Sequence, residues 1–222
     1  MSLDASFQKV DHAKLCRVGF YDDQVLPRVL NFVMGFKVIA EERQKCLAEV
    51  KGQVLEVGFG SGHNLPYYPK GIEKVVAIDP SIVSAKLALK RIGQAAFPVE
   101  YLPLRGEEIP APSGSFDSVV STFTLCTIPD ADAALRQIRR VLKPDGRFFF
   151  VEHGRSGDPA VQRWQARMNG FQKFVCGGCH LNRDIEQLVI NAGFELLAIE
   201  KYYGKGPKVS AHLYRGIARA RS

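Results

Sequence analysis

Three glycines and one acidic side chain carry the clearest chemical signal in this sequence. Gly58, Gly60 and Gly62 follow the apolar run 54–57 at intervals of two residues. Glycine is required where the backbone takes a positive φ or comes within contact distance of a ligand. Asp79 ends a second apolar run about 20 residues after Gly58, the separation expected for a carboxylate that binds ribose hydroxyls. The pattern predicts a binding site for a ligand that contains a nucleoside.

The elements that must position these residues are a strand, a tight turn and the start of a helix. The apolar run 54–57 is typical of a buried strand, and the glycines follow it directly. A helix that begins after the turn would direct free N–H groups and the positive end of its dipole toward a ligand. The glycine spacing E-x-G-x-G-x-G differs from G-x-G-x-x-G, the dinucleotide pattern, so a nicotinamide oxidoreductase is disfavoured.

The segment Leu55–Gly62 and the strand-ending Asp79 resemble the first two motifs of the class I S-adenosylmethionine-dependent methyltransferases (methyltransferase type 11-like). The resemblance runs from about Val50 to the C-terminus. It implies an enzyme that uses S-adenosyl-L-methionine as its cofactor and transfers the methyl group. It also implies a set of cofactor-binding residues, which are Glu56, Gly58, Gly60, Gly62, Asn64, Asp79, Pro80, Gly106, Glu107 and Thr122.

Shorter motifs make the chain most similar, within that superfamily, to the methyltransferase-like enzymes that methylate alkyl thiols. The resemblance implies a small, lipophilic acceptor, with a thiol as the nearest match. A broader likeness to methyltransferases of phospholipid amines or quinones stays open. A non-catalytic cofactor-binding or scaffold protein is the alternative from another class, although Asp79 and the intact glycines argue against it. The matching segments are 78–80, 106–107, 125–126, 140–146, 152–153 and 178–183.

The residues that follow the expected strand 116–122 are candidates for the acceptor side. In open α/β sheets, ligands bind beyond the carboxyl ends of the strands, where the strand order reverses. Thr122, Leu125 and Cys126 lie at this point of the chain. Cys126 is a candidate catalytic residue because its thiol is polarisable and reactive as a thiolate. A buried structural cysteine is the alternative.

His153 closes the expected strand 147–151 together with Glu152. An imidazole has a pKa near neutrality, so His153 is a candidate general base that would raise the thiolate fraction of a thiol acceptor. The equal alternative is that it holds the loop backbone in place. No second acid–base pair accompanies it.

The segment Cys176–His180 has the C-x-x-C-H spacing of covalent haem attachment. Such attachment needs an oxidising compartment, and a zinc site would need a fourth ligand that the spacing does not supply. No metal is therefore expected. A glycine-bearing loop before a helix at 184–191 is favoured, and the resemblance to thiol methyltransferases places Cys179, His180 and Arg183 on the acceptor side.

The segment 22–51 has apolar residues at three-to-four spacing and predicts one or two helices with a bend at Gly35. We expect residues 1–50 to form an N-terminal helical cap and residues 51–222 to form the methyltransferase domain. In the resembled superfamily this region forms a lid over the cofactor, which makes Tyr21 a candidate substrate contact. A plain packing helix and, more weakly, an interfacial membrane helix are the alternatives.

The expected fold class is α/β, a Rossmann-like seven-stranded sheet that is mostly parallel and has helices on both faces. Helices are predicted at 81–92 and 131–142, followed by a turn at 143–146. The segments 194–203 and 211–220 predict a C-terminal hairpin. This hairpin would supply the one antiparallel strand, as in the resembled superfamily.

The composition, 46% hydrophobic and 24% charged, predicts a folded chain with a core of normal size. The net charge of +7 is dispersed, and no aromatic–basic cluster of the kind that stacks bases is visible, so nucleic acid is disfavoured as a partner. The five cysteines predict reduced thiols in the cytoplasm. No signal peptide or membrane-spanning segment is expected, peripheral membrane contact stays open, and the oligomeric state is not predicted.

Overall fold

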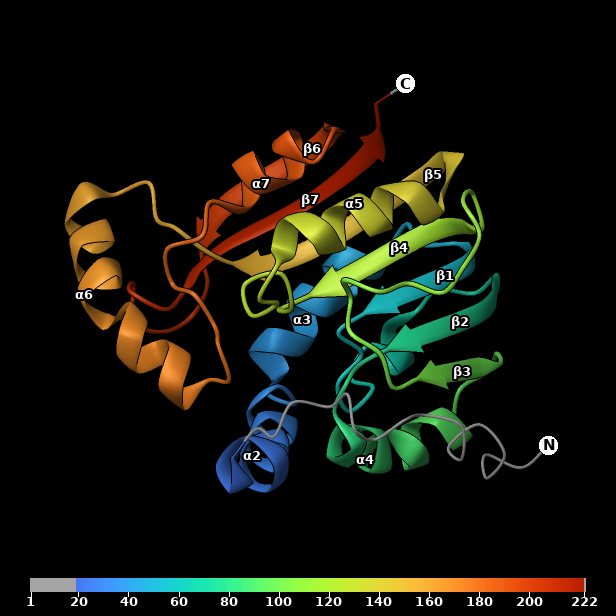
Figure 1. Cartoon of the computed structure of the whole chain (residues 1–222), viewed down its shortest axis with the longest axis horizontal. Helices are drawn as coiled ribbons and strands as arrows, with labels where there is room; N and C mark the ends of the chain where they lie inside the picture. The colour runs from blue at the N-terminus through green and yellow to red at the C-terminus, as the bar shows by residue number, and fades with distance from the viewer. Residues whose placement is uncertain (1–18, 222) are drawn as a thin grey trace.

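A seven-stranded sheet with the order β3-β2-β1-β4-β5-β7-β6 forms the centre of the computed structural model, which describes residues 19–221 (Figure 1). The pairs from β3 through β5 are parallel, whereas β7 pairs antiparallel with both β5 and β6. The predicted fold class and its single reversed strand are confirmed. The strands are β1 (Gly52–Val57), β2 (Ile72–Ile78), β3 (Val99–Leu102), β4 (Phe116–Thr122), β5 (Leu142–His153), β6 (Phe194–Tyr203) and β7 (His212–Ala220).

Helices cover both faces of the sheet, because successive strand residues point to opposite sides. In β5, Phe148 and Phe150 belong to a core cluster shared with α5 and α7. Phe149 and Val151 belong to a second cluster shared with α3 and α4. The helices are η2 (Tyr21–Val25), α2 (Leu26–Val33), α3 (Lys37–Leu47), η3 (Leu65–Tyr67), α4 (Ile82–Gly93), α5 (Ala131–Val141), α6 (Pro159–Val175) and α7 (Ile185–Asn191).

Side-chain caps determine where the later helices begin. Ser81, Asp130, Asp158 and Asp184 each accept a hydrogen bond from a first-turn backbone N–H, in α4, α5, α6 and α7 respectively. A short polar side chain at this position satisfies one of the unpaired donors of a helix N-terminus. The predicted helices 81–92, 131–142 and 184–191 are confirmed to within one residue at each end, whereas α6 was not predicted.

The helix predicted directly after the glycine turn is wrong. The segment between β1 and β2 forms only η3, a single 3₁₀ turn that contains Pro66. Pro69 follows it, and proline lacks the N–H donor that a continuing helix needs and clashes with the preceding turn. The three-residue η3 is too short to direct a helix dipole at the glycine turn. A ligand there could be bound only by individual backbone N–H groups of the turn.

The predicted turn at 143–146 lies within the bounds of β5. The pairing between β4 and β5 jumps from Phe116–Leu142 to Ser118–Arg147, so the intervening residues form an irregularity in the strand. A bulge of this kind inserts extra residues without ending the strand. The strand continues to His153, as the sequence predicted.

The N-terminal part of the described chain consists of η2, α2 and α3, and Gly35 lies in the break between α2 and α3 where a bend was predicted. Residues 1–18 lie outside the described residues, so the cap at 1–50 stays a prediction. None of the helices within residues 19–221 combines the length and the hydropathy that crossing a bilayer requires.

Candidate active site

The glycine turn after β1 is shaped by positive backbone angles. Gly58 has a φ of 76°, and a Cβ built there would lie 2.0 Å from Oγ1 of Thr124, so only glycine lets the loop after β4 come this close. Gly60 has a φ of 55°, and a Cβ there would meet no atom within 4 Å. A side chain at position 60 would thus project into open space in front of the turn. That space is where a ligand can contact the backbone.

Asp79 follows β2 and holds this turn. Its Oδ2 accepts a hydrogen bond from the backbone N–H of Gly60 at 2.8 Å, and its Oδ1 accepts one from the N–H of Ser81, also at 2.8 Å. Burial raises the pKa of the carboxyl group, while the two N–H donors oppose that rise. The carboxylate and the open side of Gly60 therefore lie next to each other, and binding of ribose hydroxyls there stays a prediction.

Other predicted cofactor residues surround the same edge of the sheet. Gly106 is buried, and a Cβ there would lie 2.7 Å from Val57 of β1, so glycine permits close packing of this loop. Glu107 is partly exposed, and its Oε1 lies 3.5 Å from the backbone N of Asp130. Pro80 is exposed beside Asp79. These placements fit the adenosyl part of S-adenosylmethionine, and the individual roles stay predictions.

A buried polar network lies behind the glycine turn. Glu56, fully buried, accepts hydrogen bonds from Nδ2 of Asn64 at 2.8 Å and from the hydroxyl of Tyr68 at 2.7 Å. Burial raises the pKa of Glu56 to about 7. Arg43 of α3 donates to Oδ1 of Asn64 at 2.8 Å and to Oγ1 of Thr122 at 2.7 Å. The network thus ties the N-terminal helices to β1 and β4.

Arg43 was not predicted from the sequence. Its side chain is buried, its Nε has no hydrogen-bond partner within residues 19–221, and desolvation lowers the pKa of its guanidinium. The residue sits in the run Glu41-Glu42-Arg43-Gln44-Lys45, where polar or charged side chains occupy every position. Nothing in such a run distinguishes the one arginine that turns inward.

Phe123, the first residue after β4, was also missed. Its φ is 55°, in the left-handed region that is strained for a bulky side chain. The guanidinium of Arg43 lies 5.5 Å from the centroid of the Phe123 ring. The chain is therefore bent sharply where the acceptor side was predicted to begin.

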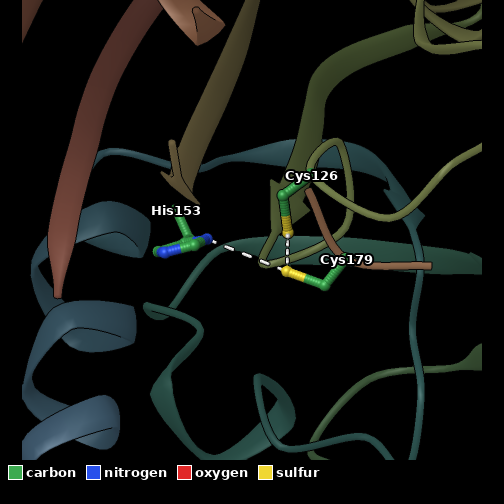
Figure 2. Close-up of side chains that lie close together, drawn as sticks. All are labelled: Cys126, His153 and Cys179. Carbon is green, nitrogen blue, oxygen red and sulfur yellow. Dashed lines mark hydrogen bonds between the residues drawn. The ribbon is translucent and has the colours of Figure 1, made fainter. Parts of the chain in front are cut away.

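The structure brings three of the predicted acceptor-side residues together. Figure 2 shows Cys126 and Cys179 pointing at each other, with the His153 ring beside them. The two sulfur atoms are hydrogen-bonded at 3.6 Å, and Sγ of Cys179 lies 3.8 Å from Nδ1 of His153. The contact with Cys126 and the imidazole lower the pKa of Cys179, whereas the same sulfur contact and burial raise the pKa of Cys126. Nε2 of His153 has no partner within the described residues.

Glu152, which precedes His153 in the sequence, holds the loop after β4 and does not join the two cysteines. Its carboxylate is fully buried and accepts hydrogen bonds from Ser121 Oγ, from the N–H of Thr124 and from the N–H of Cys126. It thus fixes the backbone of the loop after β4. Because it is fully buried and already accepts these three bonds, it is not placed to bind the positive charge of an amine acceptor.

Arg183 fastens the same loop from the other side. Its Nη1 donates to the carbonyl oxygens of Leu125 and of Ile128, the latter at 2.6 Å, and its Nη2 donates to the carbonyl of Pro129 at 3.3 Å. The backbone N–H of His180 donates to the carbonyl of Cys126 at 2.8 Å. Arg183 and His180 therefore position the loop through its backbone.

Two predicted substrate residues lie apart from the sulfur atoms. The Leu125 side chain is fully buried in the core cluster that includes α5 and α7. Tyr21 of η2 donates from its hydroxyl to the carbonyl of Val175, at the end of α6, at 2.9 Å. The contact joins the N-terminal helices to α6, which stands beyond the carboxyl ends of the parallel strands (Figure 1). Substrate contact by either residue stays a prediction.

Comparison with known proteins places the geometry in context. Residues 55–150 match the family model described as a methyltransferase domain. The chain is 31% identical over 154 residues to the thiol S-methyltransferase TMT1A of Homo sapiens, covering 68% of this chain and 63% of that protein. It is 33% identical over 183 residues to TMT1B of Rattus norvegicus, covering 75% and 72%. The match thus spans less than two thirds of the human relative.

A bacterial lipid enzyme and a solved structure are also similar. The phosphatidylethanolamine N-methyltransferase of Cereibacter sphaeroides is 29% identical, with coverage of 76% of this chain and 84% of that protein. A SAM-dependent methyltransferase of Leishmania major superposes with a TM-score of 0.67 at 17% identity, covering 90% of this chain and 80% of that one. The structural match supports the fold and nothing finer.

Proposed function

Because the chain belongs to the class I S-adenosylmethionine-dependent methyltransferases, we propose that it transfers the methyl group to the sulfur of a small, lipophilic thiol. The observation that carries the thiol assignment is the 33% identity to a thiol S-methyltransferase across 75% of this chain. Within the superfamily, an amine or quinone acceptor would be the next most similar choice.

The residues of the turn and of the strand ends would hold the cofactor. We propose that Asp79 binds the ribose hydroxyls, that the backbone at Gly60 lies against the ligand, and that Glu107 and Thr122 complete its surroundings. When bound, S-adenosylmethionine supplies a methyl group attached to a positively charged sulfur. The chain then has to align the acceptor sulfur with that methyl group and exclude water. Few catalytic side chains are needed for this task.

The chemistry of the acceptor edge supports a sulfur nucleophile. A thiol reacts as its thiolate, so a group that favours deprotonation has to lie near it. His153 is the predicted base, and its Nδ1 faces the sulfur of Cys179 in a buried site. Glu152 is engaged by three donors and is not placed to receive an ammonium group.

A phospholipid amine is the second candidate acceptor. The similarity to the phosphatidylethanolamine N-methyltransferase favours it. Large apolar side chains are also exposed on the helices at the acceptor edge, including Phe32 of α2 and Trp164, Phe171 and Phe174 of α6, each at least 56% exposed. Such side chains suit a substrate presented in a lipid surface.

Transfer of a labelled methyl group from S-adenosylmethionine separates these candidates. The acceptors are an alkyl thiol, the alcohol of the same chain length, phosphatidylethanolamine in mixed micelles and a quinone. The proposal expects a labelled thioether from the thiol and no product from the alcohol. If phosphatidylethanolamine were the only acceptor to give a labelled product, the thiol proposal would be wrong and a phospholipid amine would be the acceptor.

A further inference from the structure

Cys126, Cys179 and His153 come from three separate segments, yet their ligand atoms all lie within 4.8 Å of one another. Cys126 lies in the loop after β4, His153 is the last residue of β5, and Cys179 follows α6. Their exposed fractions are 2%, 7% and 8%. Cys176, the other cysteine of the C-x-x-C-H segment, does not join the group. The cluster was invisible to the spacing argument because two of its members lie far away in the sequence.

The spacing of these atoms matches the edges of a metal tetrahedron. Zinc bonds of ~2.3 Å to sulfur and ~2.0 Å to nitrogen, at tetrahedral angles, separate two sulfur ligands by ~3.8 Å and a sulfur from a nitrogen by ~3.5 Å. The structure has 3.6 Å between the two sulfur atoms and 3.8 Å between Sγ of Cys179 and Nδ1 of His153. Two of the three edges thus match, and the third, between Cys126 and His153, is no longer than 4.8 Å.

The loops that carry the two cysteines are held together by their backbones. The N–H of His180, next to Cys179, donates to the carbonyl of Cys126 itself. Glu152 accepts the N–H of Cys126, and Arg183 binds the carbonyls on both sides of it. Outer contacts of this type orient metal ligands in known sites. The two cysteine ligands are thus held by groups that are not themselves ligands, whereas Nε2 of His153 has no partner within the described residues.

We propose that Cys126, Cys179 and His153 form a zinc site whose fourth position takes the thiolate of the acceptor. No fourth Cys, His, Asp or Glu within residues 19–221 belongs to the group. Three protein ligands with an open position are typical of catalytic zinc sites, whereas structural sites use four. This inference rests on the proposed thiol methylation and gives His153 the role of ligand in place of base.

The chemical step balances without an oxidant or a reductant. A thiol that coordinates zinc loses its proton to solvent, since a coordinating thiol is deprotonated outright. The thiolate sulfur forms the new bond to the methyl carbon while the bond from that carbon to the cofactor sulfur breaks. The electron pair of the broken bond stays on the cofactor sulfur and neutralises its charge, and the zinc ion remains divalent.

Metal binding tests the site directly, without the methyl donor. The full chain is loaded with Zn²⁺ or Co²⁺, freed of excess metal and measured for metal content and absorption. We expect one ion per chain, the visible bands of tetrahedral Co²⁺ and a thiolate-to-cobalt charge-transfer band. An alkyl thiol should strengthen the charge-transfer band, and the matching alcohol should not. Metal-free protein, a spectrum without tetrahedral bands, or a disulfide between the cysteines detected by mass would overturn the proposal.

Substitutions assign the ligands. Cys126→Ser, Cys179→Ser and His153→Ala should each weaken Co²⁺ binding more than about tenfold, since even outer-shell changes have effects of that size. Cys176→Ser is the matched control because Cys176 belongs to the same C-x-x-C-H segment but not to the cluster. It should keep wild-type metal affinity. Equal metal affinity in the Cys126→Ser and Cys176→Ser proteins would overturn the ligand assignment.

Separate readouts distinguish failure of the site from failure of the proposed function. Unchanged thiol methylation by protein shown to be metal-free overturns the zinc site and leaves the function intact. A cobalt spectrum that responds to the thiol, without thioether formation once S-adenosylmethionine is added, overturns the thiol function and leaves the metal site intact. Loss of methylation on metal removal, with recovery on adding Zn²⁺, supports both.

Discussion

Asp79 and Gly60 are joined by a hydrogen bond of 2.8 Å, from the backbone N–H of Gly60 to the carboxylate of Asp79. The residues belong to two neighbouring strand ends, and the second carboxylate oxygen holds the N–H of Ser81 at the start of α4. One side chain thus sets the shape of the turn and the position of a carboxylate beside it. The proposed cofactor site depends on both.

Replacement of Asp79 by Ala is expected to weaken S-adenosylmethionine binding by ~1.5–3 kcal/mol, the contribution of hydrogen bonds to a charged group. Calorimetric titration measures the change. Asp117→Ala is the matched control, because Asp117 also accepts a backbone N–H, from Gln53, but lies at the amino end of β4. Equal affinities in the two variants would contradict a ribose role for Asp79.

Replacement of Gly60 by Ala is expected to block the cofactor while the chain still folds. The methyl group would project into the open space before the turn, where no protein atom lies within 4 Å. Gly114→Ala imposes a similar backbone strain, of about 1–2 kcal/mol, at a φ of 68° and also in open space, but before β4. Both variants should lose similar stability in urea, and only Gly60→Ala should lose cofactor affinity.

Replacement of Arg183 by Lys is expected to reduce kcat more than cofactor affinity. A lysine cannot reproduce the fork that donates to the carbonyls of Leu125, Ile128 and Pro129, so the loop that carries Cys126 would lose its fixed position. Arg136→Lys, at an exposed position of α5, is the control. Steady-state kinetics with the thiol acceptor and calorimetry with the cofactor measure the two effects. Wild-type kcat in Arg183→Lys would exclude a positioning role.

Sequence periodicity and caps were sufficient for most of the fold. The apolar runs located the strands, and Ser81 and Asp184 marked helix starts that the structure confirms. The glycine turn was predicted as a helix start because glycines precede helices in related folds, but the prolines at 66 and 69 prevent a longer helix here. α6 was missed although its apolar residues recur at helical spacing after the cap Asp158, at Val161, Trp164, Met168, Phe171 and Val175.

The site could be predicted only where its residues adjoin a motif. Asp79 and the glycines are close to strand ends, so topology alone brings them together. The contact between Cys126 and Cys179 depends on how two long connections pack, and 53 residues separate the pair. Arg43 is important because it is buried, and Phe123 because its backbone is strained. Neither property can be predicted from the residue type and its sequence neighbours.

Glu56 is expected to make stability depend on pH. Its carboxyl group is fully buried beside β1, and burial raises its pKa from 4.5 to about 7. Hydrogen bonds from Tyr68 and Asn64 and the charge of Arg43 oppose the rise without cancelling it. The folded state therefore holds a proton that the unfolded state releases between these two pH values. By linkage, the stability that the protonated Glu56 carboxyl contributes to the folded state is fully present below pH 4.5. It is lost as the pH rises through about 7.

The matching variant is Glu56→Gln, which keeps the shape of the side chain and cannot ionise. The free energy of unfolding of the wild type should fall relative to the variant by about 2.5 kcal/mol between pH 5 and pH 8, because each pKa unit corresponds to ~1.36 kcal/mol. Urea unfolding across this range measures the difference. Asp79 and Glu152, whose pKa values burial also raises, titrate in both proteins and cancel from it. Parallel stability curves would show that Glu56 stays ionised in the folded chain, with Arg43 as its effective counter-charge.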